Sequence, residues 1–411
     1  MTTSTLLLYI GLLLGSQVLL GIAWSLLRKR LGKAAAAVED KAHQPVRQPR
    51  AWGGVRAFRV ARRAYEDVAQ TQCSFYLEPV DGKTLPDYKP GQFLTFSLLL
   101  AAEPAAVARP VTRCYSLSDS PASDHYRVTV KRMVAPAEPA GVPEGAASNF
   151  FHDHVHAGNT LQIRAPSGHF HLDTTALTPV VLIAGGIGIT PMLSMLRWCA
   201  QHQPQRLVHL YYGVRNSGEH AYKALLEDMA SQLPQLQLHV VYSKPLTGDR
   251  PALDYRHRGH ADLALLKQTL PPGARQFYIC GPSAMMESLV PGLMEWGVPA
   301  ADIHFEAFGP ATVRLCAAQP PGQEAVLPIS VQFQRSGRTL DWSGQQSNLL
   351  DFAEAHGIAV ESGCRSGSCG SCVSTIVSGA VDYASPPDFD LSPGQCLLCV
   401  GRPRNTLALN A

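Results

Sequence analysis

The chain has 411 residues, which is too long for one compact core and predicts about three domains. Its 46% hydrophobic and 16% charged residues exclude a largely disordered protein. The net charge of +3 is concentrated in residues 1–63, which hold eleven Lys and Arg, so the remainder is acidic and a nucleic-acid-binding face is excluded. The ten cysteines lack the spacing of a disulfide framework, which favours a reducing compartment.

The N-terminus contains an uncharged run at residues 6–27, long enough at about 1.5 Å per residue to cross a bilayer core of about 30 Å. Four basic residues follow it at once, and none precedes it. The positive-inside bias therefore predicts a single-pass anchor in the inner (plasma) membrane with the catalytic domains in the cytoplasm. A cleaved signal peptide is the alternative, but it needs a basic segment before the apolar run. Residues 1–33 are predicted to be the anchor and its basic flank, and 34–54 a linker.

Residues 55–174 carry short apolar or alternating runs separated by turn dipeptides such as Asp81-Gly82 and Pro90-Gly91. This pattern predicts a small antiparallel β-barrel. The apolar run at 93–100 is too short for a second membrane span.

Two stretches of this domain suit a flavin dinucleotide. The first is Arg113-Cys-Tyr115-Ser116-Leu-Ser118, which supplies a permanent cation for a diphosphate and an aromatic wall for a flat ring. It resembles the R-x-Y-S-x-S motif of the ferredoxin-NADP reductase superfamily, and most closely the reductase portion of flavohaemoglobins. The resemblance implies that Arg113 neutralises the flavin phosphates, Tyr115 covers the ring and Ser116 bonds near its N5 atom.

The second stretch is Gly145-Ala-Ala-Ser148-Asn149, which resembles the second phosphate loop of the same superfamily. It implies FAD rather than FMN as the cofactor.

Residues 175–312 switch to alternating strands and helices, which predicts a Rossmann-like α/β domain. A buried parallel strand at 180–184 leads into a glycine-rich turn and a helix running to about Cys199. Glycines permit close approach of a pyrophosphate, and the helix N-terminus attracts the anion. The predicted NAD(P)H-binding residues of this turn are Gly185, Gly186, Gly188, Thr190 and Pro191. Packing alone is the alternative explanation.

Two later strands end in candidate ligand-binding residues, since open α/β sheets bind ligands at the carboxyl ends of their strands. Arg215 stands where a 2′-phosphate could be held, although a solvated Arg is equally ordinary there, and NADH is slightly favoured over NADPH. Cys280-Gly281-Pro282 resembles the family turn that lies beside the nicotinamide. That resemblance makes Cys280 a positioning residue; a buried structural thiol is the alternative.

His304-Phe-Glu306-Ala-Phe308-Gly-Pro resembles the family's terminal F-E-x-F-G segment, which reaches back to the flavin. The resemblance implies that Phe308 covers the ring until nicotinamide displaces it and that Glu306 assists proton handling. A purely structural Glu-x-Phe is the alternative.

After a second linker at 313–326, residues 327–411 contain Cys364, Cys369 and Cys372 in C-x4-C-x2-C spacing and Cys399 further on. This is the ligand pattern of plant-type 2Fe-2S loops, and the intervening glycines and serines let the backbone wrap around the cluster. A zinc site is the alternative, but zinc usually takes a second close pair. Cys396 competes with Cys399 as fourth ligand. The segment resembles plant-type β-grasp ferredoxins, whose last ligand follows a short apolar run, and this favours Cys399.

Two further groups of potential ligands have no predicted site. His152, His154 and His156 are interpreted as solvated positions on a helix and turn rather than a metal site. The remaining cysteines without paired spacing are interpreted as small apolar residues: Cys73, Cys114, Cys199 and Cys316.

This order of domains predicts an electron relay. NAD(P)H gives up two electrons at once as a hydride, a 2Fe-2S cluster accepts one, and a flavin connects the two. Reductases of ring-hydroxylating dioxygenases and hybrid-cluster proteins share this order. We expect a membrane-anchored NAD(P)H reductase that feeds an oxygenase, hydroxylase or desaturase, itself membrane-associated. A quinone reductase subunit and a redox sensor that uses its cluster to control a partner are the alternatives.

Overall fold

The computed structural model describes residues 51–100, 109–121, 124–135, 144–308, 328–384 and 387–411. The expected membrane helix at 6–27, most of the linker at 34–54 and all of the linker at 313–326 lie outside these ranges. Within the described residues, no helix is both long enough and apolar enough to cross a bilayer. Arg50–Ala411 form one compact unit, which contains three domains.

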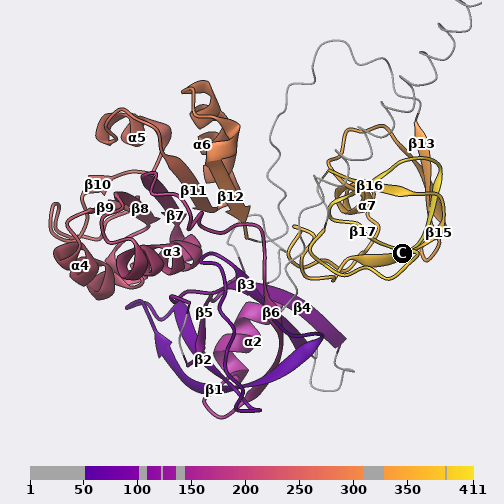
Figure 1. Cartoon of the computed structure of the whole chain (residues 1–411), viewed down its shortest axis with the longest axis horizontal. Helices are drawn as coiled ribbons and strands as arrows, with labels where there is room; N and C mark the ends of the chain where they lie inside the picture. Colours follow the sequence, from indigo (N-terminus) through magenta and orange to yellow (C-terminus); the bar gives the residue numbers. More distant parts are fainter. Residues whose placement is uncertain (1–50, 101–108, 122–123, 136–143, 309–327, 385–386) are drawn as a thin grey trace, which may run out of the picture. The chain divides into compact units, whose positions relative to one another are not determined.

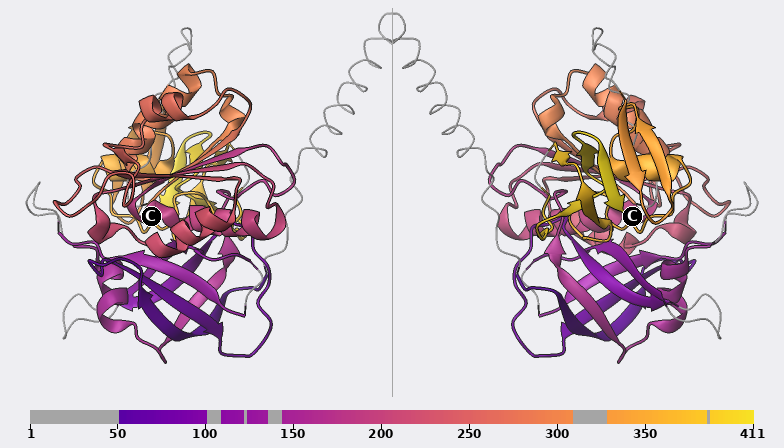
Figure 2. Two further views of the ribbon diagram at one scale, coloured as in Figure 1. Left: turned by 90° about the vertical axis from the view of Figure 1, so that its left-hand side faces the viewer. Right: turned by 90° about the vertical axis from the view of Figure 1, so that its right-hand side faces the viewer.

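The first domain is a six-stranded antiparallel sheet with strand order β4-β3-β6-β1-β2-β5 (Figure 1). Its elements are β1 (Val55–Tyr65), β2 (Gln72–Pro79), β3 (Phe93–Leu100), β4 (Arg109–Ser116), β5 (Tyr126–Lys131), α2 (Ala146–His154) and β6 (Thr160–Ser167). The sheet curls strongly, as two further views show (Figure 2). Its edge strands β4 and β5 are joined near their ends by an isolated bridge, Leu117 to Val128. The predicted barrel is therefore a half-barrel, because β4 and β5 do not pair along their length.

Alternating side chains build the core of this half-barrel. Every second residue of β6 from Leu161 to Ser167 is buried, as a strand with one covered face requires. Helix α2 lies over the open end and inserts Phe151, whose ring centroid is 5.2 Å from that of Phe75 and 5.3 Å from that of Phe96. These aromatic contacts fix the helix that carries the predicted phosphate loop.

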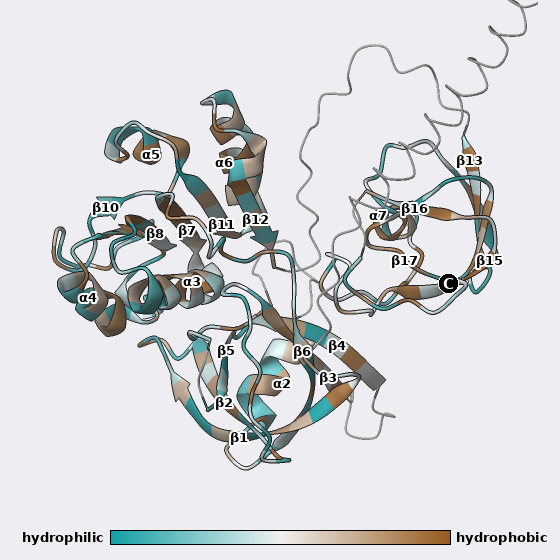
Figure 3. Ribbon diagram, viewed as in Figure 1, coloured by the Kyte–Doolittle hydropathy of each residue, from teal (hydrophilic) through white to brown (hydrophobic). Residues whose placement is uncertain are grey.

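The second domain is a parallel six-stranded sheet with order β10-β9-β8-β7-β11-β12. Its strands are β7 (Val180–Gly185), β8 (Val208–Val214), β9 (Leu236–Tyr242), β10 (His257–Arg258), β11 (Gln276–Gly281) and β12 (Ile303–Ala307). The helices are α3 (Ile189–His202), α4 (Lys223–Gln232), α5 (Leu263–Thr269) and α6 (Ser283–Glu295). Apolar side chains gather along the central strands (Figure 3), and β7 is buried throughout because helices cover both faces of the sheet.

Two separate apolar clusters cover the two faces of this sheet, one with α3 and α4 and the other with α5 and α6. The strand order reverses at β7, whose neighbours are β8 on one side and β11 on the other. The carboxyl ends of these three strands therefore form the crevice in which doubly wound sheets bind ligands.

The third domain is a mixed five-stranded sheet with order β14-β13-β19-β15-β17 and a separate pair of short strands, β16 and β18. Its elements are β13 (Ile329–Phe333), β14 (Arg338–Trp342), α7 (Leu349–Ala355), β15 (Val373–Ser378), β16 (Val381–Tyr383), β17 (Gln395–Leu397), β18 (Gly401–Pro403) and β19 (Leu407–Asn410). Asn348 begins α7 by accepting a hydrogen bond from the Asp351 backbone N–H. This mixed sheet with one helix agrees with the β-grasp ferredoxin domain expected at residues 327–411.

Candidate functional site

Strand β4 ends in the predicted flavin motif, and its side chains are arranged to receive a ligand. The Tyr115 ring packs edge-on against Phe151 and Phe96, with centroids 5.0 and 5.6 Å away. Burial raises the pKa of its hydroxyl. The Ser116 hydroxyl is buried and has no hydrogen-bond partner within the described residues. A buried orphan of this kind indicates a missing ligand atom.

The cation of the motif is also available. The Arg113 side chain is exposed and its guanidinium donates to the Thr112 carbonyl at 2.8 Å. No acidic side chain in the described ranges pairs with it, so it can meet a phosphate. Ser118 differs, because its hydroxyl already contacts Thr129 at 3.0 Å inside the half-barrel. Its role is to hold the end of β4 rather than to face the crevice.

The second phosphate loop begins helix α2. Gly145 is its N-cap, and the Ser148 hydroxyl donates to the Gly145 carbonyl at 2.9 Å. A Cβ on Gly145 would lie 2.5 Å from that hydroxyl oxygen, so the loop has no room for a side chain there. The Asn149 Oδ1 atom is buried without a partner in the described residues, again as a cofactor-binding loop requires.

The three histidines after this loop are not all solvated, which corrects the sequence interpretation for one of them. His152 is 3% exposed, and its Nε2 atom lies 2.9 Å from the Val130 carbonyl oxygen. Burial lowers the pKa of His152, so it is neutral near pH 7. His154 and His156 are exposed as predicted. The amphipathic register of α2 decides the difference, because His152 lies one turn from buried Ser148.

The glycine-rich turn of the second domain packs directly on the Cys280-Gly281-Pro282 turn. A Cβ on Gly188 would lie 2.0 Å from the Cys280 carbonyl oxygen, and one on Gly185 would lie 2.7 Å from Pro282 Cδ. Gly186 has φ +54°, a conformation that favours glycine. The two turns predicted separately are thus one structure at the crevice.

Helix α3 begins immediately after this turn. The Thr190 hydroxyl donates to the Ile187 carbonyl at 3.0 Å, and Pro191 occupies the first helical turn, where a missing N–H costs nothing. The N-terminus of α3 therefore lies at the carboxyl end of β7, where a helix dipole favours a pyrophosphate.

Cys280 and Glu306 lie next to each other on paired strands β11 and β12. Cys280 is fully buried, and burial raises the pKa of its thiol. Burial also raises the pKa of Glu306 to about 8, with a smaller contribution from Cys364. Its Oε2 atom has no partner within the described residues. A carboxyl group that is protonated at neutral pH can hold or donate a proton at this site. Phe308, the last described residue of the domain, is 36% exposed.

Arg215 lies beyond the end of β8 and is mostly exposed. Its guanidinium pairs with Glu219 at 3.1 Å, and Glu219 also pairs with Lys131 at 2.8 Å. The positive charge of Arg215 is therefore already partly compensated before any 2′-phosphate arrives.

The cluster loop has the backbone conformation that the glycine spacing predicted. Gly367 and Gly370 have φ of +77° and +79°. Backbone N–H groups point at the cysteine sulfurs: those of Ser366, Ser368 and Cys369 lie 3.3–3.4 Å from Cys364 Sγ. Such N–H···S contacts stabilise thiolate ligands.

The structure distinguishes the two candidates for the fourth ligand. The Cys399 thiol interacts with the thiols of Cys364 and Cys372, and its backbone N–H lies 3.4 Å from Cys372 Sγ. Cys396 is fully buried in the apolar core of the domain, where burial raises its pKa to about 12. Four cysteines are the ligand number of a two-iron cluster, with two thiols for each iron.

Sequence reasoning missed the residue that anchors this loop to the helix beside it. Arg365 has φ +53°, and its guanidinium reaches back to two carboxylates of α7, Asp351 at 3.5 Å and Glu354. A cation between two acidic residues of a helix is a detectable signal only when the loop is known to fold onto that helix.

The cluster loop also contacts the flavin-motif domain. The Cys114 thiol, between Arg113 and Tyr115, interacts with the thiols of Cys364 and Cys369. Nearby, His169 Nε2 lies 3.1 Å from Asp388 Oδ2, and the Arg164 guanidinium lies 5.9 Å from the Phe389 ring centroid. Cys114 is therefore more than the small apolar residue expected, because it meets the predicted cluster ligands.

Comparison with known protein families agrees with this geometry. Residues 182–290 match the oxidoreductase NAD-binding domain, and residues 331–404 match the 2Fe-2S iron-sulfur cluster binding domain. The chain is 36% identical to the flavohemoprotein of Halalkalibacterium halodurans over 290 residues, which are 70% of this chain and 68% of that protein.

Two solved structures resemble this one. The FAD/NAD-binding domain of nitric oxide dioxygenase from Vibrio cholerae O1 biovar El Tor is 32% identical; the match covers 62% of this chain and 99% of that chain, with a TM-score of 0.53. Full-length CYP116B46 from Tepidiphilus thermophilus is 26% identical; the match covers 90% of this chain and 44% of that chain, with a TM-score of 0.50.

Proposed function

Since the chain belongs to the ferredoxin-NADP reductase-like family of FAD- and NAD-binding reductases and carries a C-terminal 2Fe-2S ferredoxin domain, we propose that it supplies electrons to a separate oxygenase, hydroxylase or desaturase. It is an NAD(P)H-dependent flavin and iron-sulfur oxidoreductase. FAD, when bound, takes a hydride from NAD(P)H, and the 2Fe-2S cluster then carries electrons one at a time.

Different residues of this chain would bind FAD, bind NAD(P)H and exchange the proton. Arg113 and the N-terminus of α2 would hold the FAD diphosphate, and Tyr115 and the orphaned Ser116 hydroxyl would hold the ring. The turn around Gly188 would bind the NAD(P)H pyrophosphate against the start of α3. The protonated carboxyl of Glu306 would exchange a proton at the crevice.

One observation carries the proposal of an electron outlet through the cluster. The cysteines of the cluster loop lie against β4, the strand that bears the flavin motif, through the contact of Cys114 with Cys364 and Cys369. The contact of His169 Nε2 with Asp388 Oδ2 at 3.1 Å supports the same placement. A flavin site and a one-electron centre held in contact favour transfer between them within one chain.

The outlet supports the proposed class of acceptor. Oxygenases, hydroxylases and desaturases take up electrons singly, and a cluster delivers them that way. The uncharged run at 6–27 and the basic residues after it further favour a reductase tethered to the inner membrane, facing the cytoplasm, and an acceptor or substrate in that membrane.

The test uses full-length protein extracted from membranes and a tag-matched variant, Cys369→Ala. We expect flavin absorbance near 450 nm that is bleached anaerobically by NAD(P)H, followed by the paramagnetic signal of a reduced two-iron cluster. Cys369→Ala should still reduce ferricyanide, which accepts electrons from the flavin, but should lose reduction of cytochrome c and of the co-purifying oxygenase. Reduction of a quinone by the isolated protein as fast as its reduction of cytochrome c would refute the proposed class of partner. Equal rates of cytochrome c reduction by wild type and Cys369→Ala would refute the outlet through the cluster.

A further inference from the structure

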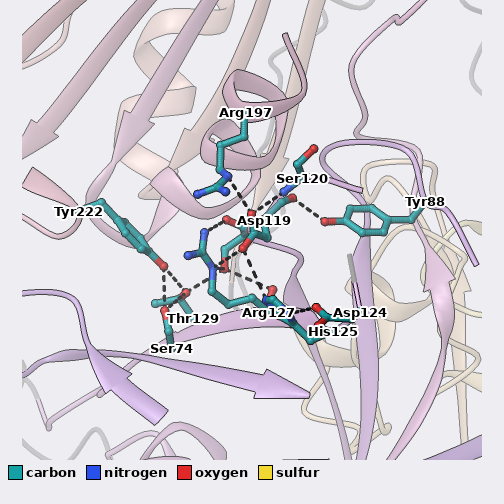
Figure 4. Close-up of polar contacts among 11 residues, drawn as sticks. Ser74, Tyr88, Asp119, Ser120, Asp124, His125, Arg127, Thr129, Arg197 and Tyr222 are labelled. Atoms are coloured by element: carbon teal, nitrogen blue, oxygen red, sulfur yellow. Dashed lines mark hydrogen bonds and ion pairs between the residues drawn. The ribbon is translucent and has the colours of Figure 1, made fainter. Parts of the chain in front are cut away.

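The turn that follows the flavin motif connects the first domain to the NAD(P)-binding helix. Leu117, Ser118, Asp119 and Ser120 come directly after Ser116, the last residue of β4, and all four are buried. The polar contacts of this turn are drawn in Figure 4. Asp119 lies at their centre, between side chains from both domains.

Two contacts join the turn to successive turns of helix α3. Arg197 Nε lies 2.8 Å from Asp119 Oδ1, and the Ser120 hydroxyl donates to Gln201 Oε1 at 2.5 Å. Arg197 and Gln201 are four residues apart, so they share one face of the helix. The turn therefore contacts α3 at two levels, which restricts both rotation and translation of the helix.

On the other side, Asp119 is fixed to the half-barrel. Arg127 Nε lies 3.6 Å from Asp119 Oδ2 and also donates to the Ser118 hydroxyl at 3.1 Å. The Tyr88 hydroxyl donates to the Asp119 backbone carbonyl at 2.5 Å. Arg127 is only 4% exposed, so its position is set by packing. A carboxylate held this firmly transmits any displacement of the turn to α3.

One end of this connection is the flavin motif, and the other is the helix that begins at the proposed pyrophosphate site. Asp119 is three residues beyond Ser116. Arg197 is eight residues beyond Ile189, the first residue of α3, about 12 Å along the helix axis at about 1.5 Å per residue. We propose that Asp119 and Arg197 are positioning residues that set the separation of the NAD(P)H pyrophosphate site from the flavin motif, and thereby the hydride-transfer distance.

Other contacts hold the two domains together, so this role is separable from domain assembly. Before helix α4, the Tyr222 hydroxyl reaches into the half-barrel to Ser74 at 3.0 Å, and Lys131 pairs with Glu219 at 2.8 Å. Both contacts come from the segment before α4 rather than from α3. The Tyr222 hydroxyl also contacts Thr129, which contacts the Ser118 hydroxyl of the turn (Figure 4). Loss of the Asp119–Arg197 pair should therefore leave the domains docked but the helix less precisely placed. A displacement of about 1 Å from a reactive geometry costs up to about 10²-fold in rate.

The test compares Arg197→Met and Arg197→Lys with Arg250→Met in the full-length protein loaded with FAD. Arg250 is a matched control, because its partly exposed ion pair with Asp254 is on the same domain at 3.3 Å. Anaerobic stopped-flow gives the rate of flavin bleaching by NADH and by NADH deuterated at C4, and hydrogen exchange gives the protection of residues 189–202 without substrate.

We expect Arg197→Met to slow flavin bleaching about tenfold with a larger deuterium isotope effect, an NADH dissociation constant within twofold of wild type, and faster exchange in α3. Arg197→Lys should keep part of the wild-type bleaching rate, and the control Arg250→Met should bleach at the wild-type rate. A bleaching rate and isotope effect equal to wild type in Arg197→Met would overturn the proposal, as would a loss that Arg197→Lys shares fully. If Arg197→Met fails to fold, Gln201→Ala serves in its place with the same criteria. Absence of bleaching in the wild type would instead count against the oxidoreductase function itself.

Discussion

Replacement of Gly188 by Ala tests the crevice most directly, because the space there is measured. The added Cβ would lie 2.0 Å from the Cys280 carbonyl oxygen and 2.5 Å from its carbonyl carbon, whereas real Cβ contacts essentially never fall below 3.0 Å. The turn and strand β11 must therefore separate by at least 1.0 Å. Both neighbours are backbone atoms in a fully paired sheet, so no flexible side chain can absorb the change.

This displacement predicts two effects of different size. Overpacking of this kind costs about 1–3 kcal/mol in stability, which lowers Tm by about 2–4 °C per kcal/mol in a unit of about 250 residues. A shift of about 1 Å between the nicotinamide turn and the pyrophosphate turn should lower the rate of hydride transfer by about 10²-fold. Function should thus suffer more than folding.

The assay is anaerobic flavin bleaching by NADH, measured beside thermal unfolding of the same samples. Gly248→Ala is the control, because a Cβ there meets nothing within 4 Å and the residue lies in the same domain. Bleaching by Gly188→Ala within twofold of wild type, with an unchanged Tm, would show that the two turns do not pack as described. The steric requirement for glycine at this position would then disappear as well.

Three further outcomes are expected. Cys399→Ala should abolish the visible absorbance of the cluster, whereas Cys396→Ala should keep the cluster and lower Tm only; an intact spectrum in the first variant would contradict the ligand set. Because the pKa of Glu306 is raised to about 8 in the fold from 4.5, its contribution to stability is complete below pH 4.5 and is lost as pH rises through 8, at up to about 1.4 kcal/mol per pH unit. The Tm of Glu306→Gln should therefore fall less steeply than that of wild type as the pH rises from 6 to 9. Parallel plots of Tm against pH would disprove the raised pKa. Arg215→Ala should raise the KM for NADPH more than the KM for NADH. The difference should be about tenfold or less, because Arg215 is already paired with Glu219. Equal increases in both KM values would show that Arg215 does not bind the 2′-phosphate.

The individual motifs were readable because each depends on local chemistry. Cysteine spacing defines which thiols can reach one cluster, and a strand followed by a glycine-rich turn and a helix brings N–H groups to a phosphate whatever surrounds it. The strand at 180–184, the glycine-rich turn and helix after it, and the wrapping of the cluster loop at its glycines were predicted in this way.

Other features were missed because they depend on residues far apart in the chain. His152 has the same neighbours in sequence as a solvated histidine, but its face of α2 turns toward the Val130 carbonyl. Ser118 belongs to the flavin motif by spacing, yet its hydroxyl turns inward to Thr129. Arg365 is a glycine-loop residue by sequence and a link to α7 in space.

The sequence by itself determined the three chemistries of this protein, flavin, nicotinamide and iron-sulfur, and their order along the chain. Only the tertiary structure decided how they are held: that Gly188 packs on Cys280, that Cys114 meets the cluster cysteines, and that Asp119 joins the flavin strand to α3. The reason is physical. A ligand-binding turn is specified by the allowed conformations of a few consecutive residues, whereas a contact between domains depends on side-chain directions fixed by packing of the whole core.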